Sequence, residues 1–188
     1  TGDALLYRFD TRSVVVLNAG LPLGLYVPAG TSRDGSVAFI SGSDGYYRID
    51  RPAGTATKLD LGVDGPPAFG GYRVSMPSFF DDTATGPVVS ADGRFITYSA
   101  MALGTPTPSA IPGFAASCSE CLRQFVLDTI TGTRTLVGAE LWGGWPGDVH
   151  LSADGRHVLF RFNPRRTLIE YTPGAWWVSD LDTGRSQR

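Results

Sequence analysis

Leu151–Phe160 reads Leu-Ser-Ala-Asp-Gly-Arg-His-Val-Leu-Phe, and Val89–Tyr98 reads Val-Ser-Ala-Asp-Gly-Arg-Phe-Ile-Thr-Tyr. A third copy, Thr31–Phe39, reads Thr-Ser-Arg-Asp-Gly-Ser-Val-Ala-Phe. The aspartates of the three copies lie 58 and 62 residues apart. This spacing is somewhat long for one four-stranded repeat unit and fits a unit with inserted loops. The chain therefore contains an internal repeat, and this repeat determines the predicted fold.

Each copy predicts a strand, a tight turn and a second strand, because Asp-Gly between β-forming residues is a strong hairpin signal. Glycine adopts a positive φ at low cost, and the Ser and Asp side chains can bind nearby backbone groups. The residues after the turn alternate, so that one face of the sheet meets a core and the other a neighbour or solvent. We expect structural turn roles for Asp34, Gly35, Asp92, Gly93, Asp154 and Gly155.

A second hairpin follows each Asp-Gly turn. Phe125–Val137 and Trp177–Arg185 both read as a strand, a turn that starts at Asp and ends at Gly, and the start of a further strand. Weaker copies are Tyr47–Leu59 and Leu6–Leu17. Two successive hairpins make a four-stranded meander, and four-stranded sheets repeated radially make a β-propeller. The predicted fold class is therefore all-β, a β-propeller of four-stranded antiparallel blades.

The repeated phrase resembles that of the TolB-like, or WD-repeat-like, propeller repeat. The second copy matches best, at Ser90, Asp92, Gly93, Arg94 and Tyr98, whereas the first copy has Ser36 where Arg is usual. The resemblance covers nearly the whole chain and implies a fold rather than an activity. Propellers of this kind include enzyme accessory domains, periplasmic scaffolds and secreted proteins.

Strand counting predicts a single propeller domain over 1–188, with strands of a split blade at 4–17 and blades at 24–61, 86–138 and 148–188. That is little more than three blades, with three strands expected in the last, whereas propellers close with four to eight. The chain is then a fragment of a longer polypeptide, or half of a homodimer that completes the ring, or it holds a degenerate fourth blade. We favour the first two. Strand exchange would pair Ser13–Leu17 with Trp177–Asp182.

Composition indicates a soluble domain and excludes two classes of partner. The chain has 188 residues, 42% of them hydrophobic, with 24 Gly, 13 Pro and a formal charge of −2. It has no basic stripe with interleaved aromatics, so we expect no nucleic acid. No apolar run approaches the roughly 20 residues of a spanning helix, so we expect no membrane span. The start at Thr1, with no visible signal peptide, indicates a processed or trimmed product.

The two cysteines, Cys118 and Cys121, end a long segment rich in Pro, Ala and Gly. A redox Cys-x-x-Cys would need a helix N-terminus in a βαβ context, which the sequence does not suggest. A zinc site would need two more ligands, and only His150 and His157 are on offer. We favour a local disulfide, which implies a secreted, periplasmic or cell-envelope location, and the other two readings stay open.

No catalytic, metal or cofactor site is expected. Ser152, His150 and Asp154 could suggest a hydrolytic triad, but Asp154 belongs to the hairpin and Ser152 has the turn role of Ser32 and Ser90. The carboxylates of Asp81 and Asp82 fit a solvated cap better than an acid–base pair or, with Asp64, a calcium site.

Aromatic residues are the main functional signal. Of Trp176 and Trp177, adjacent on a strand, one should face a neighbouring blade and the other the opposite side. The Gly-flanked Trp142 and Trp145, with Asp148, are candidate ligand-binding residues for a sugar or peptide, although tryptophans in propellers usually pack between sheets.

Three functions follow. The favoured one is a non-catalytic secreted or envelope propeller that binds or scaffolds a protein or other ligand. The second is a lectin-like glycan binder that uses the Trp142 and Trp145 loop. The third is the accessory propeller of a hydrolase whose catalytic domain lies elsewhere.

Overall fold

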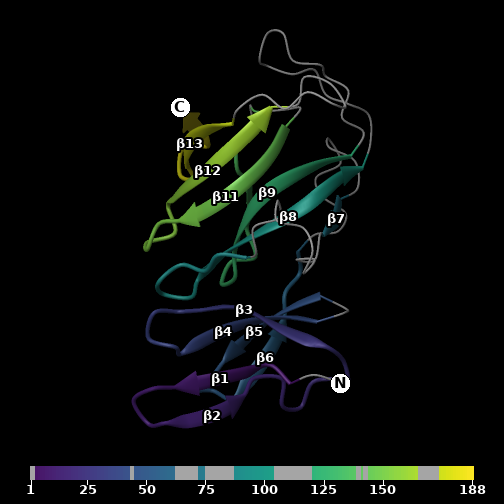
Figure 1. Cartoon of the computed structure of the whole chain (residues 1–188), viewed down its shortest axis with the longest axis vertical. Helices are drawn as coiled ribbons and strands as arrows, with labels where there is room; N and C mark the ends of the chain where they lie inside the picture. Colours follow the sequence, from purple (N-terminus) through teal and green to yellow (C-terminus); the bar gives the residue numbers. More distant parts are fainter. Residues whose placement is uncertain are drawn as a thin grey trace.

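The computed structural model of the chain describes residues 3–42, 45–61, 72–74, 87–103, 120–138, 141, 144–164 and 174–188. Regular structure in these residues is entirely β, arranged as a two-stranded hairpin and three four-stranded antiparallel sheets (Figure 1). No helix among the residues described here has the length and hydropathy needed to cross a membrane.

The hairpin comprises β1 (Leu5–Arg8) and β2 (Ser13–Val16), paired so that Leu5 lies opposite Val16. The run of β-branched valines in β2 favours extended backbone. The hairpin is closed at its base, where the Leu17 N–H donates to the Ala4 carbonyl over 2.8 Å. It occupies the segment 4–17, for which the sequence predicts two strands.

The first four-stranded sheet follows in the order β3-β4-β5-β6. Its strands are β3 (Tyr26–Thr31), β4 (Val37–Gly42), β5 (Gly45–Asp50) and β6 (Thr55–Lys58). All six residues of β4 are buried, because both faces of this strand are covered by neighbouring sheets.

The second sheet has the order β7-β8-β9-β10. Its strands are β7 (Tyr72–Val74), β8 (Phe95–Leu103), β9 (Glu120–Asp128) and β10 (Arg134–Leu136). The sequence prediction started this blade at residue 86, whereas its first strand lies at 72–74. Because β8 is nine residues long, one short segment cannot pair its whole edge. β7 pairs one end of that edge and Val89 bridges Ile96 near the other.

The third sheet has the order β11-β12-β13-β14. Its strands are β11 (Gly144–Leu151), β12 (His157–Pro164), β13 (Ala175–Asp180) and β14 (Arg185–Gln187). The predicted strand exchange with Ser13–Leu17 is wrong, as is the count of three strands here. The turn ending at Gly184 returns the chain so that Asp180 pairs with Arg185, and β14 takes the edge of β13.

Three apolar clusters fill the spaces between successive sheets. The hairpin and the first sheet lie in the lower half of the view in Figure 1, and the second and third sheets lie in the upper half. Buried residues from the hairpin and the first sheet form one cluster: Ala4, Leu17, Tyr26, Ala38, Ile40, Tyr47 and Ile49. The first and second sheets share another: Val37, Phe39, Tyr46, Leu59, Leu61, Ile96, Tyr98, Phe125 and Leu127. The last is centred on the third sheet, with Val126 from the second: Val126, Val137, Leu141, Val149, Val158, Phe160 and Phe162. Each sheet therefore buries one face against the sheet before it.

Candidate docking surface

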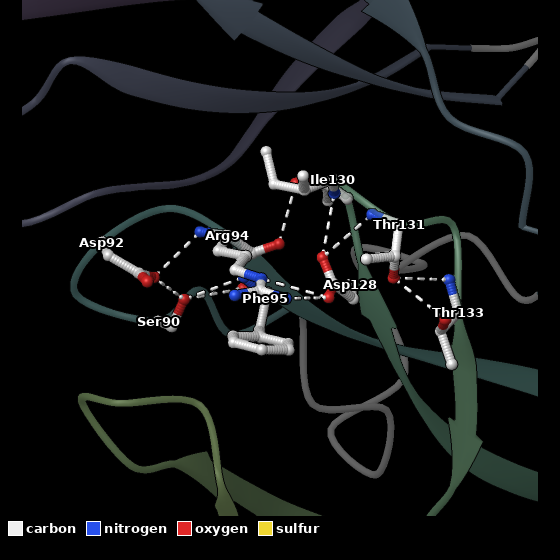
Figure 2. A network of polar contacts seen from close by, with 9 residues as sticks. Ser90, Asp92, Arg94, Phe95, Asp128, Ile130, Thr131 and Thr133 are labelled. Carbon is white, nitrogen blue, oxygen red and sulfur yellow. Dashed lines mark hydrogen bonds and ion pairs between the residues drawn. The ribbon is translucent and has the colours of Figure 1, made fainter.

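The repeated turn is a closed hydrogen-bond network, shown for the second copy in Figure 2. The Ser90 hydroxyl donates to Asp92 Oδ1 over 2.6 Å and accepts the Phe95 N–H over 2.9 Å. Asp92 Oδ1 also accepts the Arg94 N–H over 2.9 Å. The Gly93 N–H donates to the Ser90 carbonyl, and the glycine has φ +71°. Each residue of the motif thus has a structural task.

The other two copies repeat this network. Ser32 and Ser152 donate to Asp34 and Asp154 over 2.7 and 2.6 Å, and Gly35 and Gly155 have φ of +67° and +73°. The hydrogen bond from Ser32, with others from Ser36, lowers the pKa of Asp34 to about 2. The Ser152 hydroxyl likewise lowers the pKa of Asp154. All six predicted turn residues therefore lie in tight turns closed by the same hydrogen bonds.

Arg94 joins the two hairpins of the second sheet, a role that the sequence analysis did not assign. Its Nε and Nη2 atoms donate to Asp128 Oδ2 over 3.1 and 2.6 Å (Figure 2). The Arg94 guanidinium, helped by N–H groups of the following turn, lowers the pKa of the buried Asp128 to about 2. This pairing could have been predicted from the sequence, because Arg94 follows Asp-Gly in one turn and Asp128 begins the next turn.

In the first copy, a different arginine links the two turns of the sheet. Ser36 replaces the arginine and donates from its hydroxyl to Asp34 Oδ1 over 2.8 Å. The guanidinium of Arg51, in the adjacent turn, donates to the Gly35 carbonyl. The departure from the repeat pattern therefore keeps a cationic link between the two turns, with the arginine moved to the other turn.

The turn glycines are sites of close approach between sheets. A Cβ atom on Gly93 would lie 2.7 Å from Val37 Cβ, in the sheet before it. A Cβ atom on Gly155 would lie 2.7 Å from Phe95 Cγ, again in the preceding sheet. The turn therefore needs glycine both for its φ and for the fit between sheets.

Burial of equivalent positions differs sharply in the third sheet. Counted from the turn serine, Phe39, Thr97 and Leu159 are equivalent. Phe39 and Thr97 are 0% exposed, whereas Leu159 is 39% exposed. On the neighbouring strands, Val126 lies across from Thr97 and is 2% exposed, whereas Val178 lies across from Leu159 and is 43% exposed. The next sheet covers this face in the first two sheets, and no described residue covers it in the third.

We call this uncovered surface of the third sheet the open face. Aligned on the aspartates that end β5, β9 and β13, its Trp176 is equivalent to Tyr46 and Gln124. Both of these are 2% exposed, whereas Trp176 is 47% exposed. Trp177 points to the other side and packs against the core cluster of the third sheet, as alternation predicts. The open face consists of His150, His157, Leu159, Arg161, Trp176 and Val178.

Charged groups border the apolar centre of the open face. Arg161 Nη1 lies 3.7 Å from Asp148 Oδ2, and both side chains are about half exposed. Asp148 has φ +48° and lies at the bulge where β11 shifts register against β12. The His150 ring lies 6.1 Å from the Trp176 ring, between centroids. Exposed ion pairs contribute little stability, so the contact between Arg161 and Asp148 adds little to the folded state.

The predicted ligand residues are only partly placed. Asp148 lies at the border of the open face, and ligand binding by it remains a prediction. Trp145 is in β11 opposite Asn163, and its side chain lies outside the described set, as does all of Trp142. Of the cysteines, Cys121 pairs with Ala102 in the sheet, and Cys118 lies outside the described residues, so the disulfide also remains a prediction.

The geometry leaves no Ser–His–Asp relay at the third turn. The Ser152 proton is directed to Asp154, and its oxygen accepts the His157 N–H over 2.9 Å, so the hydroxyl is engaged within the turn. The ring of His150 stacks obliquely near Trp176. In the described part of the chain, no three His, Cys, Asp or Glu side chains are grouped to hold a metal. Asp64, Asp81 and Asp82 lie outside it.

No protein-family model and no curated protein sequence matches the chain. A number of solved structures share its fold at low identity. Dipeptidyl peptidase 4 of Porphyromonas gingivalis matches with a TM-score of 0.64 and 10% identity, over 100% of this chain and 30% of that one. The tricorn protease matches with a TM-score of 0.54 and 14% identity, over 93% and 15%. TolB of Acinetobacter baumannii matches with a TM-score of 0.51 and 16% identity, over 97% and 36%.

The chain thus spans at most 36% of the length of these three proteins. Their low identity carries a likeness of fold and none of activity. The repeated turn, the stack of four-stranded antiparallel sheets and these likenesses together identify the fold of the chain as that of the TolB-like β-propellers.

Proposed function

We propose that this protein is a non-catalytic propeller module that binds another protein through the open face. The observation that carries the proposal is the exposure of Leu159 and Trp176, whose equivalents in the other two sheets are buried, together with that of Val178, whose equivalent Val126 in the second sheet is buried. Contiguous apolar surface of this kind, bordered by polar groups, is typical of protein interaction sites.

The composition of the open face supports a protein partner. Tryptophan and arginine are enriched at protein–protein interfaces, and Trp176 and Arg161 lie on adjacent, directly paired positions of β13 and β12. A sheet face is also rigid, so binding would order few side chains. The carboxylates of the turns are engaged in backbone hydrogen bonds, which supports a structural rather than a chemical role for them.

Site-specific photo-crosslinking tests the proposal. A benzophenone amino acid replaces Trp176 in the whole chain, which is returned to its cells of origin. The matched control places the same group at Ile130, a turn residue that is 67% exposed and lies off the open face. We expect a defined protein adduct from position 176, lost when Leu159→Asp is added, and none from position 130. Equal labelling from both positions would refute the proposal.

A glycan is the second candidate ligand, and the exposure of Trp176 beside polar groups favours it. An indole face bordered by Asp148 and Arg161 could stack on a sugar ring while the charged groups bind hydroxyls. Tryptophan fluorescence titrated with neutral oligosaccharides would show a saturable shift that Trp176→Phe abolishes. A protein adduct at position 176 without any such shift would leave only the protein partner.

A secreted, periplasmic or envelope location is part of the proposal, and so is the hydrolase-accessory alternative. The identity of the crosslinked protein separates them. A partner with a hydrolase domain would favour the accessory role, and a non-enzymatic envelope protein would favour the scaffold.

A further inference from the structure

We propose that binding at the open face is switched by pH, and that protonation of His150 releases a partner whose contact surface is apolar and uncharged. This inference rests on the proposed function, because it names the regulation of the same surface. It is carried by the placement of the two histidines of the chain, both of which lie on the open face. Histidine is the side chain that ordinarily changes charge between about pH 5 and 8.

Neither histidine is required by the repeat. Counted from the turn serine, the equivalents of His150 are Gly30 and Val88, and those of His157 are Val37 and Phe95. Both imidazole rings are exposed to solvent on the sheet face, and the core lies on the other side of the sheet. The two histidines therefore differ from the residues that build the turns, and they are free to respond to pH.

His150 lies beside the apolar centre of the open face. It pairs with Leu159 on β12, and Leu159 pairs with Val178 on β13, so that these three residues form one row across the sheet. The adjacent row contains Arg161 and Trp176. The rings of His150 and Trp176 lie 6.1 Å apart between centroids, with 34° between their planes. The two rings thus reach toward each other across β12, and a partner on the apolar centre would cover His150.

Negative charge surrounds His157. Its Nε2 atom lies 4.0 Å from Oδ2 of Asp180, which is directly opposite on β13. Its charge also acts on Asp154 in the turn. Hydrogen bonds within the turns, led by the Thr183 N–H and the Ser152 hydroxyl, lower the pKa of both carboxylates, so that both are ionised where histidine titrates. A proton on His157 is therefore compensated.

His150 has no such compensation among the described residues. Its charged neighbours on the face are Asp148 on its own strand and Arg161 and His157 on β12. Asp148 is paired with Arg161, whose Nη1 atom lies 3.7 Å from its Oδ2. From β13, the ring that approaches His150 is the uncharged Trp176. No carboxylate in the described part of the chain forms an ion pair with His150, so its proton adds an unpaired positive charge.

The partner surface that fits this face is apolar and uncharged. The exposed centre consists of Leu159, Trp176 and Val178. The charged groups around it are already paired within the chain, and the cores of protein interfaces are depleted in charged residues. Such a partner removes water from the His150 ring without supplying an opposite charge. Burial of an unpaired imidazolium costs far more than burial of the neutral ring.

Binding therefore selects the neutral form of His150. The bound state then holds fewer protons at this position than the free state, so the affinity falls as the pH falls. Below the range in which histidine titrates, the affinity decreases about tenfold for each pH unit.

Photo-crosslinking at two pH values tests the switch. The benzophenone amino acid replaces Val178 in the whole chain, because Trp176 contacts the His150 ring and should stay in place. A limiting amount of this protein is mixed with an extract of its cells of origin at about pH 7.5 and at about pH 5.5, on either side of the ordinary histidine range. After brief irradiation, the yield of the protein adduct is measured, and the ratio of the two yields is compared between variants.

We expect the yield to fall about tenfold from the higher to the lower pH. His150→Gln, which is polar but does not take up a proton, should bring the ratio close to one. His157→Gln is the matched control and should keep the fall of about tenfold. His150→Lys carries a fixed positive charge and should give the low yield at both pH values. Circular dichroism at both pH values checks that each variant is folded.

Equal yields at the two pH values in the unsubstituted chain would overturn the inference and leave the proposed function intact. A fall that persists in His150→Gln would also overturn it, because the pH would then act on the partner or on another residue. A fall that disappears in His157→Gln would do the same. A higher yield at the lower pH would indicate a partner that presents carboxylates to the face, again contrary to the inference. No adduct at either pH would overturn the proposed function, and this inference with it.

Discussion

Gly93→Ala should destabilise the protein far more than Gly184→Ala, although both glycines lie in turns at similar φ. Gly93 has φ +71° and Gly184 has φ +67°, so an alanine at either position incurs a similar backbone strain of about 1–2 kcal/mol. The surroundings differ. A Cβ on Gly184 meets nothing within 4 Å, whereas a Cβ on Gly93 lies 2.7 Å from Val37 Cβ and 3.0 Å from Ser32 Cβ.

Neither contact at Gly93 can be relieved by rotating a flexible chain, because both atoms are the first carbons of their side chains and one is β-branched. Overpacking of this kind costs about 1–3 kcal/mol. The gain from restricting the unfolded chain is the same for both substitutions and cancels. We therefore expect a loss of about 2–5 kcal/mol for Gly93→Ala and about 1–2 kcal/mol for Gly184→Ala.

Urea unfolding followed by tryptophan fluorescence and far-ultraviolet circular dichroism measures both losses, and coincidence of the two probes tests for a two-state transition. The difference between the variants isolates the contact between the first and second sheets, since the strain at the turn is shared. Equal losses for the two alanines would refute the assignment of Gly93 as a point of close approach between sheets.

Three further outcomes test the energetics. Asp128 has its pKa held at about 2 by Arg94, below its ordinary 3.8, so its stabilisation is present above pH 4 and is lost as the pH falls towards 2. Because the Arg94 guanidinium is half exposed, we expect its pairing with Asp128 to contribute about 1–2 kcal/mol to the free energy of unfolding. Asp128→Asn should therefore reduce the fall of the urea midpoint between pH 4 and pH 2. Ser90→Ala should lower the free energy of unfolding by about 1–3 kcal/mol at neutral pH, because it removes three hydrogen bonds made by a residue that is 1% exposed. Thermal unfolding measures this loss, and a loss below about 0.5 kcal/mol would show that the turn reorganises. Phe160→Ala should cost about 3–5 kcal/mol and Trp176→Ala less than about 1 kcal/mol, and a large loss at Trp176 would show that the open face is covered within the single chain.

The turns and the sheet order were the most predictable features, because their residues act locally. Ser90, Asp92 and Gly93 contact one another within six residues of chain, and their spacing alone indicates what each one binds. Strand alternation similarly separates Trp176 from Trp177. In the first copy, the sequence shows that Ser36 stands where the other copies have arginine, but it does not show which residue takes over the role of that arginine. Arg51 substitutes through space from a different turn.

The first strand of the second sheet and the last strand of the third were not predicted correctly, for a different physical reason. β7 and β14 are three residues each, too short to carry a periodic pattern. Their pairing is fixed by an edge left open on a longer strand, a tertiary constraint. The open face was also beyond the sequence, since Leu159 and Val178 look like ordinary core residues until the sheet that should cover them is sought.

The chemistry of the repeat explains why the third turn can be mistaken for a catalytic site. Serine, aspartate and histidine lie close together at Ser152, Asp154 and His157, yet the first two residues make the same hydrogen bonds in all three copies, two of which have no histidine. A side chain that makes the same local hydrogen bonds in every repeat has a structural role. Function is then to be sought where equivalent positions differ in residue type and exposure. Trp176 in place of Tyr46 and Gln124, and His157 in place of Val37 and Phe95, are such differences, and both lie on the open face.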